Sequence, residues 1–374
     1  MLRYLTGGES HGRSMLTIVD GVPAGLHVDR SIIDLELARR TLGYGRGMRM
    51  ALESDKVDIL SGLRKDRTIG SPVSLLVKNI DNSIDKLPKV YEPRPGHADL
   101  SGILKYNLSD VRDILERASA RETVSRVAVG AICKILLAEF GITVVSHVVA
   151  IGAAVSKAKK LTFDKIVASS IKSPVMCADK KASASMCREI DKAKRAGDTL
   201  GGIFEVLIHG VPPGLGSHAQ WDRKIDGSLA RAMMSIQAVK GVDFGIGFAC
   251  AALKGSLVHD QIFYDKRRGF YRGSNNAGGI EGGMTTGEDI VIRAAMKPIS
   301  TLRRPLSSVD IRTKKRVMAT VERSDVCAVP AAAVIGEGVC SIEIANALIE
   351  KFGGDSVSEM RRNYDGYLAQ IKRF

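Results

Sequence analysis

The sequence Pro330-Ala-Ala-Ala-Val-Ile-Gly-Glu-Gly-Val-Cys-Ser-Ile-Glu-Ile-Ala-Asn-Ala-Leu-Ile-Glu-Lys-Phe352 sets the architecture of this chain. Proline is tolerated in the first turn of a helix, and Gly353 is a residue type that commonly ends one. The interior is apolar but contains Gly336 and Gly338, each of which costs a helix about 1 kcal/mol relative to alanine. We therefore expect a long buried helix against which another backbone packs closely.

Other segments have the periodicity of helices or strands. Helices are expected at Ser31–Leu42, Ser119–Phe140 and Ile225–Ile236. Strands are expected at Met15–Asp20, Val73–Lys78, Ile142–Ala150, Ile203–His209 and Ile290–Lys297. In the last of these, Val291, Arg293, Ala295 and Lys297 point to one side, which indicates a sheet with one basic face. Because many neighbouring strands are joined by short turns, the pattern predicts an α+β fold with mostly antiparallel sheets and long buried helices.

Length and composition limit the class of protein. Length alone, at 374 residues, favours two domains or one large one, but no stretch has the composition of a linker and no repeat is present. The N-terminus lacks the apolar core of a signal peptide, and charged residues such as Lys134 and Glu139 interrupt the apolar runs before membrane-spanning length. The six cysteines form no C-x-x-C pair and no zinc spacing, so we expect reduced thiols, no metal and a cytoplasmic protein.

The charge balance indicates an anionic partner. With 55 basic and 41 acidic residues the chain carries +14, which suits either a nucleic-acid surface or a site for anionic small molecules. Aromatic residues make up only 5% of the chain, with the single tryptophan Trp221, so stacking platforms for single strands are scarce. Several arginines stand beside glycines between Arg39 and Arg49, and arginine binds phosphate and carboxylate bidentately. These features favour small anionic ligands over nucleic acid, and we expect no membrane partner.

Two short clusters carry the candidate catalytic groups. Arg94-Pro-Gly-His-Ala-Asp99 places a cation, an imidazole and a carboxylate on a loop shaped by proline and glycine. Gly8-Glu-Ser-His-Gly12 presents Ser10 and His11. The chain has only seven histidines, and His11 and His97 are both available for proton transfer. The alternatives are an ion pair between Arg94 and Asp99 across the turn, and a hairpin in which His11 is incidental.

Gly7-Gly-Glu-Ser-His-Gly-Arg-Ser14 resembles the phosphate-binding loop of nucleotide hydrolases. Arg13 stands where that loop requires lysine. The loop must also open a helix, whereas a strand-like run follows it here. A nucleotide-binding enzyme therefore stays an alternative with two departures from its motif.

Further motifs offer anion or ligand contacts. Ser119 and Glu122 have the spacing of a helix capping box, and the same helix start, flanked by arginines, suits an anion. The glycine-rich segment Asn275–Gly283 allows a ligand to approach the backbone closely. Lys297-Pro-Ile-Ser-Thr301 supplies a cation and hydroxyls, and Asp325 stands near the start of the last long helix, where a capping role is the alternative.

Taken together, these motifs resemble the chorismate synthase family. The resemblance runs through nearly the whole chain, and the joint order of its motifs is very specific. The motifs are Gly8–Gly12, Gly43-Tyr-Gly-Arg-Gly47, Arg94–Leu100, Ser119–Thr123, Gly210–Gly216, Met234–Gly241, Asn275–Gly283 and Arg323–Val326.

The resemblance implies a lyase that converts 5-enolpyruvylshikimate 3-phosphate to chorismate and phosphate. It implies an anti-1,4-elimination that needs reduced FMN without net redox change, with NADPH as an indirect reductant at most. It also implies a single-domain β-α-β sandwich over residues 1–374 and a homotetramer.

The resemblance further assigns roles to residues. Catalytic roles are implied for His11, His97, Asp325 and Ser10. Flavin contacts are implied for Arg117, Ala118, Ser119, Gln237, Ala238, Gly282, Lys297, Pro298, Ile299, Ser300, Thr301 and Arg323. Substrate contacts are implied for Arg46, Arg49, Arg94, Arg121 and Arg323, and NADP or phosphate contacts for Arg40 and Arg46. One departure is Ala118, where the family often has serine, so a side-chain contact is lost there.

Overall fold

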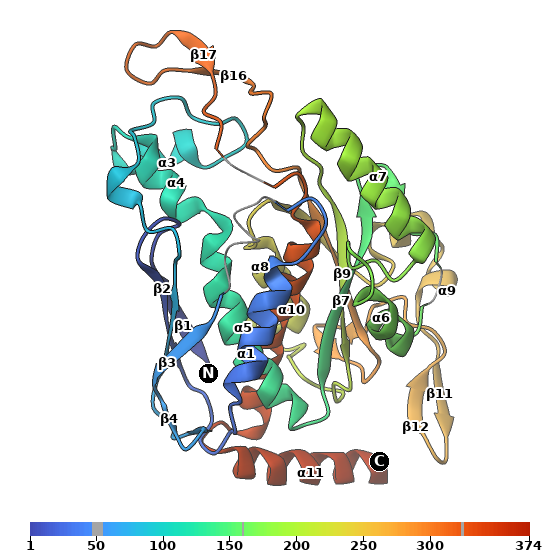
Figure 1. The fold of residues 1–374 in the computed structure, drawn as a ribbon. Helices are drawn as coiled ribbons and strands as arrows, with labels where there is room; N and C mark the ends of the chain where they lie inside the picture. Colours follow the sequence, from blue (N-terminus) through green and yellow to red (C-terminus); the bar gives the residue numbers. More distant parts are fainter. Residues whose placement is uncertain (47–54, 159–160, 323–324) are drawn as a thin grey trace.

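Two antiparallel sheets organise the computed structural model, which describes residues 1–46, 55–158, 161–322 and 325–374 (Figure 1). The first sheet has the order β1-β2-β6-β3 and the second the order β10-β15-β9-β7-β8. The strands of the first are β1 (Arg3–Gly7), β2 (Ser14–Asp20), β3 (Val57–Ser61) and β6 (Val73–Lys78). Those of the second are β7 (Thr143–Ile151), β8 (Ala154–Val155), β9 (Gly202–His209), β10 (Val239–Phe244) and β15 (Ile290–Met296).

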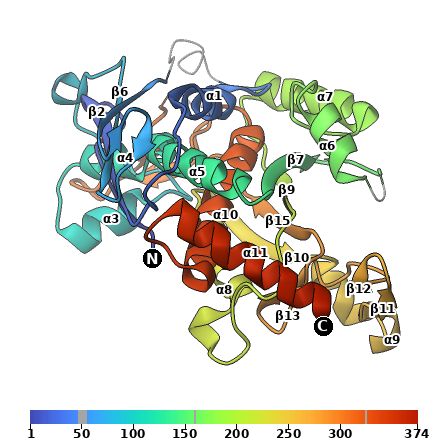
Figure 2. The same cartoon turned by 90° about the horizontal axis from the view of Figure 1, so that it is seen from below.

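Long helices lie between the two sheets (Figures 1 and 2). They are α1 (Arg30–Thr41), α5 (Thr123–Ala138), α8 (Ile225–Met234) and α10 (Val329–Phe352). Helix α5 contacts β2 and β6 of the first sheet, and α10 contacts β7 and β9 of the second. One hydrophobic core runs from Met15 and Val73 through these helices to Phe204 and Ile292. The predicted α+β class, with antiparallel sheets and long buried helices, is confirmed.

The remaining elements cover the outside. Helices α6 (Phe163–Ser170) and α7 (Lys180–Ala196) pack on β7, and α11 (Val357–Arg373) packs on α10 (Figure 1). Near the first sheet lie α3 (Asp99–Tyr106), α4 (Val111–Ala118) and the 3₁₀ helices η1 (Ile84–Lys86) and η2 (Ala120–Glu122). The other short elements are β4 (Leu63–Arg64), β5 (Arg67–Thr68), η3 (Trp221–Arg223), η4 (Gly247–Ala252), α9 (Gly255–Val258), β11 (Ile262–Asp265), β12 (Gly269–Arg272), β13 (Ile280–Glu281), β14 (Met284–Thr285), β16 (Ser307–Val309) and β17 (Arg316–Met318).

Helix α10 packs closely against α5 where both lack side chains. A Cβ atom added to Gly130 would lie 2.4 Å from the Cα of Gly338. At Gly336 the close neighbour is instead a side chain, because an added Cβ would lie 2.7 Å from the Phe204 ring. The expected close backbone is therefore present at Gly338, and Gly336 makes room for an aromatic ring of β9.

A buried cluster of four charges joins the central helices. Arg39 of α1 donates to both carboxylate oxygens of Glu337 at 2.8 Å and to Glu36 at 2.7 Å. Lys134 of α5 donates to Glu36 at 2.7 Å and also to Glu337. Burial raises the pKa of Glu337, but Lys134 and Arg39 lower it more, so its pKa is below the ordinary value and its carboxylate is ionised. The cluster is neutral overall, which a dry interior requires.

By length and composition alone, α10 would pass as a membrane span. Of its most apolar window, 89% is buried inside the protein, as in the core helix of a soluble fold. Among the described residues α10 is the only helix that meets this test.

Two sequence expectations need correction. The helix predicted from Ser119 starts at Thr123, because Ser119 caps the 3₁₀ helix η2 first. Strand β15 alternates as predicted. Its cation Arg293, however, donates to Asp243 of the neighbouring strand β10 at 3.0 Å, so the expected basic face is neutralised at this position.

Candidate active site

His11 lies in the turn between β1 and β2, where Glu116 of α4 holds its imidazole. His11 Nδ1 lies 2.8 Å from Glu116 Oε1 and 3.0 Å from Oε2, and the backbone N–H of His11 donates to Oε2 at 2.8 Å. Burial raises the pKa of Glu116, but hydrogen bonds from the His11 side chain and backbone lower it more, so the net pKa lies below its ordinary value. The carboxylate is therefore ionised at neutral pH and accepts the Nδ1 proton.

Helix α4 is anchored so that Glu116 faces this turn. The Asp110 side chain caps the helix by accepting from the backbone N–H of Arg112 at 2.9 Å, and it also accepts from that of Val90 at 2.9 Å. The backbone oxygen of Glu116 accepts from the N–H of Ser10 at 3.0 Å. These hydrogen bonds fix the start of α4 and join its end to the turn that carries His11.

Ser10 and Ser119 meet beside this pair. Ser119 Oγ donates to Ser10 Oγ at 3.1 Å and accepts from the N–H of Arg121 at 3.3 Å. Glu122, which the capping box predicts would bond back to Ser119, accepts instead from Arg126 Nε at 3.0 Å. Only the Ser119 half of the capping box is therefore formed, and the Glu122 carboxylate binds Arg126 instead.

The strand that follows His11 excludes a phosphate-binding loop of the nucleotide-hydrolase type. Residues 8–13 connect β1 to β2, which pair antiparallel from Arg3 with Asp20 to Gly7 with Leu16. A phosphate-binding loop of the nucleotide-hydrolase type opens a helix. Because β2 begins at Ser14, that alternative is wrong.

His97 belongs to a second cluster, formed with Arg94, Asp99 and Thr301. Arg94 donates to Asp99 Oδ2 through Nε at 2.8 Å and to Oδ1 through Nη2 at 3.0 Å, and its Nη1 donates to Thr301 Oγ1 at 2.9 Å. His97 Nδ1 bonds to Asp99 Oδ1. Burial raises the pKa of Asp99, but hydrogen bonds from His97 and Arg94 lower it well below its ordinary value. The ion pair left open by the sequence is therefore formed, and the same carboxylate also holds the histidine.

Asp55 pairs with Arg40 and Arg121, two arginines that the sequence predicted as ligand contacts. Arg40 donates to Asp55 Oδ2 at 2.8 Å, and Arg121 donates to Oδ1 at 2.7 Å. Burial lowers the pKa of Arg40 to about 10 against the opposing effect of Asp55, which leaves the guanidinium charged at neutral pH. Arg121 Nε donates to Asn79 at 2.8 Å, and Asn79 in turn donates to the carbonyl of Gly12 at 2.8 Å. These contacts tie the arginines to the turn that carries His11.

Asp325 pairs with Arg46. Arg46 Nη1 donates to Asp325 Oδ2 at 2.6 Å. The N-cap of α10 is Ala328, so Asp325 does not cap that helix as the alternative supposed. Within the described ranges, Arg46 Nε and Arg40 Nε are buried without a hydrogen-bond partner.

Several residues predicted to bind flavin lie where β10 and β15 meet the His97 loop. The backbone N–H of Lys297 donates to the carbonyl of Ala238 at 2.9 Å, and Lys297 Nζ donates to the carbonyl of Gly96. Gln237 Nε2 donates to Glu122 at 3.3 Å, whereas Gln237 Oε1 is buried and has no hydrogen-bond partner in the part of the chain that the structure describes.

The other predicted contacts are more dispersed. Arg117 donates to the carbonyls of Thr6 and Gly8 at 2.9 and 2.8 Å, so its guanidinium ties α4 to β1. Ala118 is the last residue of α4. Gly282 lies in the turn between β13 and β14 with open space around its Cα. Pro298, Ile299 and Ser300 connect β15 to Thr301, and Thr199 donates to the Ile299 carbonyl at 2.7 Å. Arg49 and Arg323 lie outside the described residues.

Sequence reasoning missed Glu116 and Asp55. Glu116 directly precedes Arg117, but no local pattern marks it as the partner of His11. Asp55 stands between Glu53 and Asp58, and no local pattern marks it as the partner of Arg40 and Arg121. Both act through pairing with residues far away in sequence.

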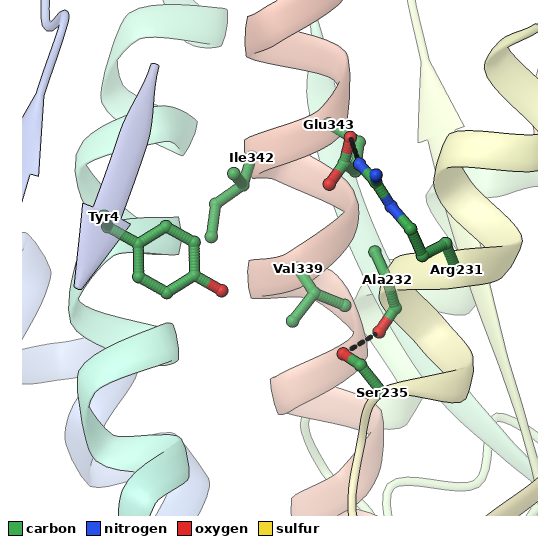
Figure 3. A pocket seen from close by; sticks show the side chains of 7 residues that line it. All are labelled: Tyr4, Arg231, Ala232, Ser235, Val339, Ile342 and Glu343. Carbon is green, nitrogen blue, oxygen red and sulfur yellow. Dashed lines mark hydrogen bonds and ion pairs between the residues drawn. The ribbon is translucent and has the colours of Figure 1, made fainter. Parts of the chain in front are cut away.

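A hollow of about 260 Å³ lies between β1, α8 and α10 (Figure 3). Figure 3 shows Tyr4 on one side and Glu343 with Arg231 on the other, with Ile342 and Val339 between them. Burial raises the pKa of Glu343, and Arg231, 3.8 Å away, lowers it less. Neither candidate histidine lines this hollow.

Comparisons with known proteins agree with one another. The sequence model of the family described as chorismate synthase matches residues 2–349. The chain is 55% identical over 394 aligned residues to a chorismate synthase of Geobacter metallireducens, and all of both chains is covered. It is 53% identical to one of Desulforudis audaxviator, covering all of this chain and 98% of the relative. A solved structure titled "Crystal Structure of Chorismate Synthase" superposes with a TM-score of 0.83 at 42% identity, covering 100% of this chain and 99% of the other.

Proposed function

The chain belongs to the chorismate synthase family and is a lyase of the shikimate pathway, and we propose that it carries out its reaction with reduced FMN bound. The reaction converts 5-enolpyruvylshikimate 3-phosphate to chorismate and phosphate. The observation that supports a proton-transfer site is the pairing of two histidines with ionised carboxylates, His11 with Glu116 and His97 with Asp99.

The described residues fit a flavin. Gln237 Oε1 is a buried acceptor without a partner in the described part of the chain, and a flavin ring offers N–H donors. Lys297 supplies a cation nearby, and Gly282 leaves open space for a close approach. Reduced FMN, when bound, lends electron density to the substrate as the allylic phosphate leaves. The residues that would hold it are Arg117, Ala118, Ser119, Gln237, Ala238, Gly282, Lys297, Pro298, Ile299, Ser300, Thr301 and Arg323.

The substrate is a phosphate with two carboxylates, so its binding needs several cations. We assign this role to Arg46, Arg49, Arg94, Arg121 and Arg323. Arg46 Nε has no hydrogen-bond partner among the described residues, which suits a phosphate oxygen. Arg94 and Arg121 already hold buried carboxylates, so they contribute positive potential and fix their partners in place. Such fixed charge stabilises the negative charge that develops on the leaving group.

The proton transfers fall to the paired histidines. His97, held through Nδ1 by Asp99, gives a proton to the departing phosphate. His11 acts as the general acid near the flavin, and Ser10 lies beside it in the same turn. Asp325, held by Arg46, would take part in proton transfer near a bound flavin.

Reduction of the flavin is assigned to a separate electron source, with NADPH acting only indirectly. Arg40, the predicted NADP contact, is buried and binds Asp55. We therefore propose that Arg40 supports Arg121 through their shared partner Asp55. Only the Nε of Arg40 could then contact the phosphate of an external ligand.

We further propose that residues 1–374 form one β-α-β sandwich domain that assembles as a cytoplasmic homotetramer. The main hydrophobic core spans both sheets, which supports one domain. The outward face of the first sheet exposes Leu5, Leu16 and Ile18, and Leu5 lies directly opposite Ile18 in the strand register. An apolar sheet face of this kind suits burial against a second copy.

The test is anaerobic incubation of the protein with 5-enolpyruvylshikimate 3-phosphate and reduced FMN, followed by measurement of chorismate. We expect product, and loss of at least about a hundredfold in turnover in His11→Ala and in His97→Ala. His209→Ala is the matched control, because His209 also bonds to a carboxylate, Asp289 at 2.7 Å, but on the surface. Absence of chorismate from folded protein contradicts the proposal.

The nucleic-acid alternative has its own test. The charge of +14 predicts salt-dependent affinity if the chain binds DNA or RNA. We expect no such affinity in titrations at low and at physiological salt. Tight binding that weakens steeply with salt supports the alternative instead.

A further inference from the structure

Glu116 accepts two hydrogen bonds from a single residue. Its Oε2 accepts from the backbone N–H of His11 at 2.8 Å, and its Oε1 lies 2.8 Å from His11 Nδ1. The Glu116 side chain is buried, and that of His11 is only 14% exposed, so water competes little for these bonds. The carboxylate therefore fixes the main chain and the ring of His11 together.

This geometry selects one tautomer of the imidazole. An ionised carboxylate only accepts hydrogen bonds, so the nitrogen that faces it must carry the proton. The proton accordingly sits on Nδ1 of neutral His11. Any proton that His11 exchanges with a bound molecule must then pass through Nε2.

A buried arginine lies close to the Glu116 carboxylate. Arg112, one helical turn earlier on α4, lies 3.8 Å from Glu116 Oε1 and 3.0 Å from Glu322 Oε1. Arg112 is buried, and its charge adds to the hydrogen bonds from His11 that lower the pKa of Glu116, against the burial that raises it. Such outer partners commonly set the orientation of a functional histidine.

We propose that Glu116 is the positioning residue that holds His11 as its Nδ1–H tautomer, with Nε2 as the nitrogen that takes part in the reaction. Its importance for turnover rests on the proposed function of His11 as a general acid. The tautomer itself is independent of that function and is measured without substrate or flavin.

Glu116→Gln tests the proposal because glutamine has only one acceptor oxygen. The backbone N–H of His11 cannot change its role, so the amide oxygen turns toward it and the amide NH₂ faces Nδ1. Nδ1 must then accept, and the proton moves to Nε2. The wrong tautomer is expected to lower turnover by about a hundredfold or more, with flavin affinity and the KM for substrate changed by less than about threefold.

The tautomer is read from two-bond ¹H–¹⁵N spectra of protein labelled with ¹⁵N-histidine. Spectra are recorded at about pH 8.5, above the ordinary histidine pKa of about 6.5. The His11 signals are assigned as those missing from His11→Ala. We expect the Nδ1–H pattern in the wild type and the Nε2–H pattern in Glu116→Gln.

Two further variants separate positioning from a general structural effect. Glu116→Asp keeps two acceptor oxygens, so we expect it to retain the Nδ1–H pattern and to recover at least about tenfold of the turnover lost in Glu116→Gln. Glu205→Gln is the matched control, because Glu205 holds His147 Nε2 at 3.0 Å between β7 and β9. It should alter the His147 signals and leave turnover and the His11 signals unchanged.

Each outcome decides a separate point. An Nε2–H pattern for His11 in the wild type, or an unchanged Nδ1–H pattern in Glu116→Gln, overturns the proposal. The wild-type spectrum decides the matter even if Glu116→Gln does not fold. If the tautomer moves as expected but turnover of Glu116→Gln stays at the wild-type level, the positioning role is wrong. If His11→Ala keeps full turnover, the assigned function of His11 fails while the tautomer result stands.

Discussion

Arg94 and Asp99 form a two-bond ion pair inside the protein, through Nε at 2.8 Å and Nη2 at 3.0 Å. Both side chains are almost fully buried, so neither charge is hydrated by bulk water. A third group, His97, shares the carboxylate. The loop that carries His97 is thus held by the same charge that orients the imidazole.

Asp99→Asn should destabilise the protein by about 3–5 kcal/mol. The substitution leaves the buried Arg94 guanidinium without its counter-charge, and breaking a buried pair on one side costs that much. Urea unfolding measures the difference. The control is Asp20→Asn, whose partner Arg3 is mostly exposed and which is itself half-exposed, and for which we expect less than about 1 kcal/mol. Equal effects of the two substitutions contradict the prediction.

The stabilisation from Asp99 should depend on pH in one direction. Its folded-state pKa is depressed below the ordinary 3.8, so its contribution is fully present above the unfolded-state pKa and is lost as the pH falls through the folded-state pKa. The difference in unfolding free energy between wild type and Asp99→Asn should stay constant from about pH 7 to pH 5 and shrink below about pH 4. Urea titrations across this range provide the check, and a difference that grows on acidification contradicts the assignment.

Glu337→Gln should also cost about 3–5 kcal/mol, because it leaves Arg39 and Lys134 with one carboxylate between them in the core. Glu350→Gln on the same helix is the control. Glu350 pairs with Arg223 at the surface, with both side chains more than half exposed, and less than about 1 kcal/mol is expected. Denaturant unfolding of both variants tests the contrast, which a similar loss in each would refute.

Gly130→Ala should destabilise the protein by about 1–3 kcal/mol, because the new methyl group would meet the α10 backbone at 2.4 Å. Gly227→Ala in α8 is the matched control. An added Cβ there meets nothing within 4 Å, so we expect a gain of up to about 1 kcal/mol from helix propensity. Opposite signs in thermal unfolding are the expected result.

Leu5→Lys should disrupt the proposed tetramer, because it places a charge on the apolar outer face of the first sheet. Light scattering after size exclusion should give a mass near four times 40.2 kDa for the wild type and a smaller one for the variant. Leu104→Lys is the control, since Leu104 on α3 is almost as exposed, at 73% against 78%. A tetramer that survives Leu5→Lys argues against this face as an interface.

The elements that the sequence predicted are those with strong periodicity. The helix predicted at Pro330–Phe352 is present as Val329–Phe352, and all five predicted strands are present within a residue or so of their expected ends. The start of the helix predicted at Ser119 was wrong because a side-chain cap fits a 3₁₀ turn as well as an α-helix. Local patterns therefore sufficed where burial repeats regularly.

The candidate site was predicted only in part. His11 and His97 were found because histidine is rare here and both stand in glycine-containing motifs. Their carboxylate partners could not be predicted from a local motif. Glu116 is 105 residues from His11, and no periodicity links two such positions. The ion pair of Asp325 with Arg46, across 279 residues, is of the same kind, and the capping role that the sequence suggested was wrong.

The position of α10 near the end of the chain matters while the protein is being made. Its most apolar stretch would be a hazard if it met a lipid bilayer or another unfinished chain. Of the elements that pack on it, α1, α5, α8, β7 and β9 precede it in sequence, and α11 follows it. The ribosome therefore releases α10 only after these earlier elements have been synthesised. The apolar helix can pack against them at once, which shortens the time for which it is exposed to membranes or other chains.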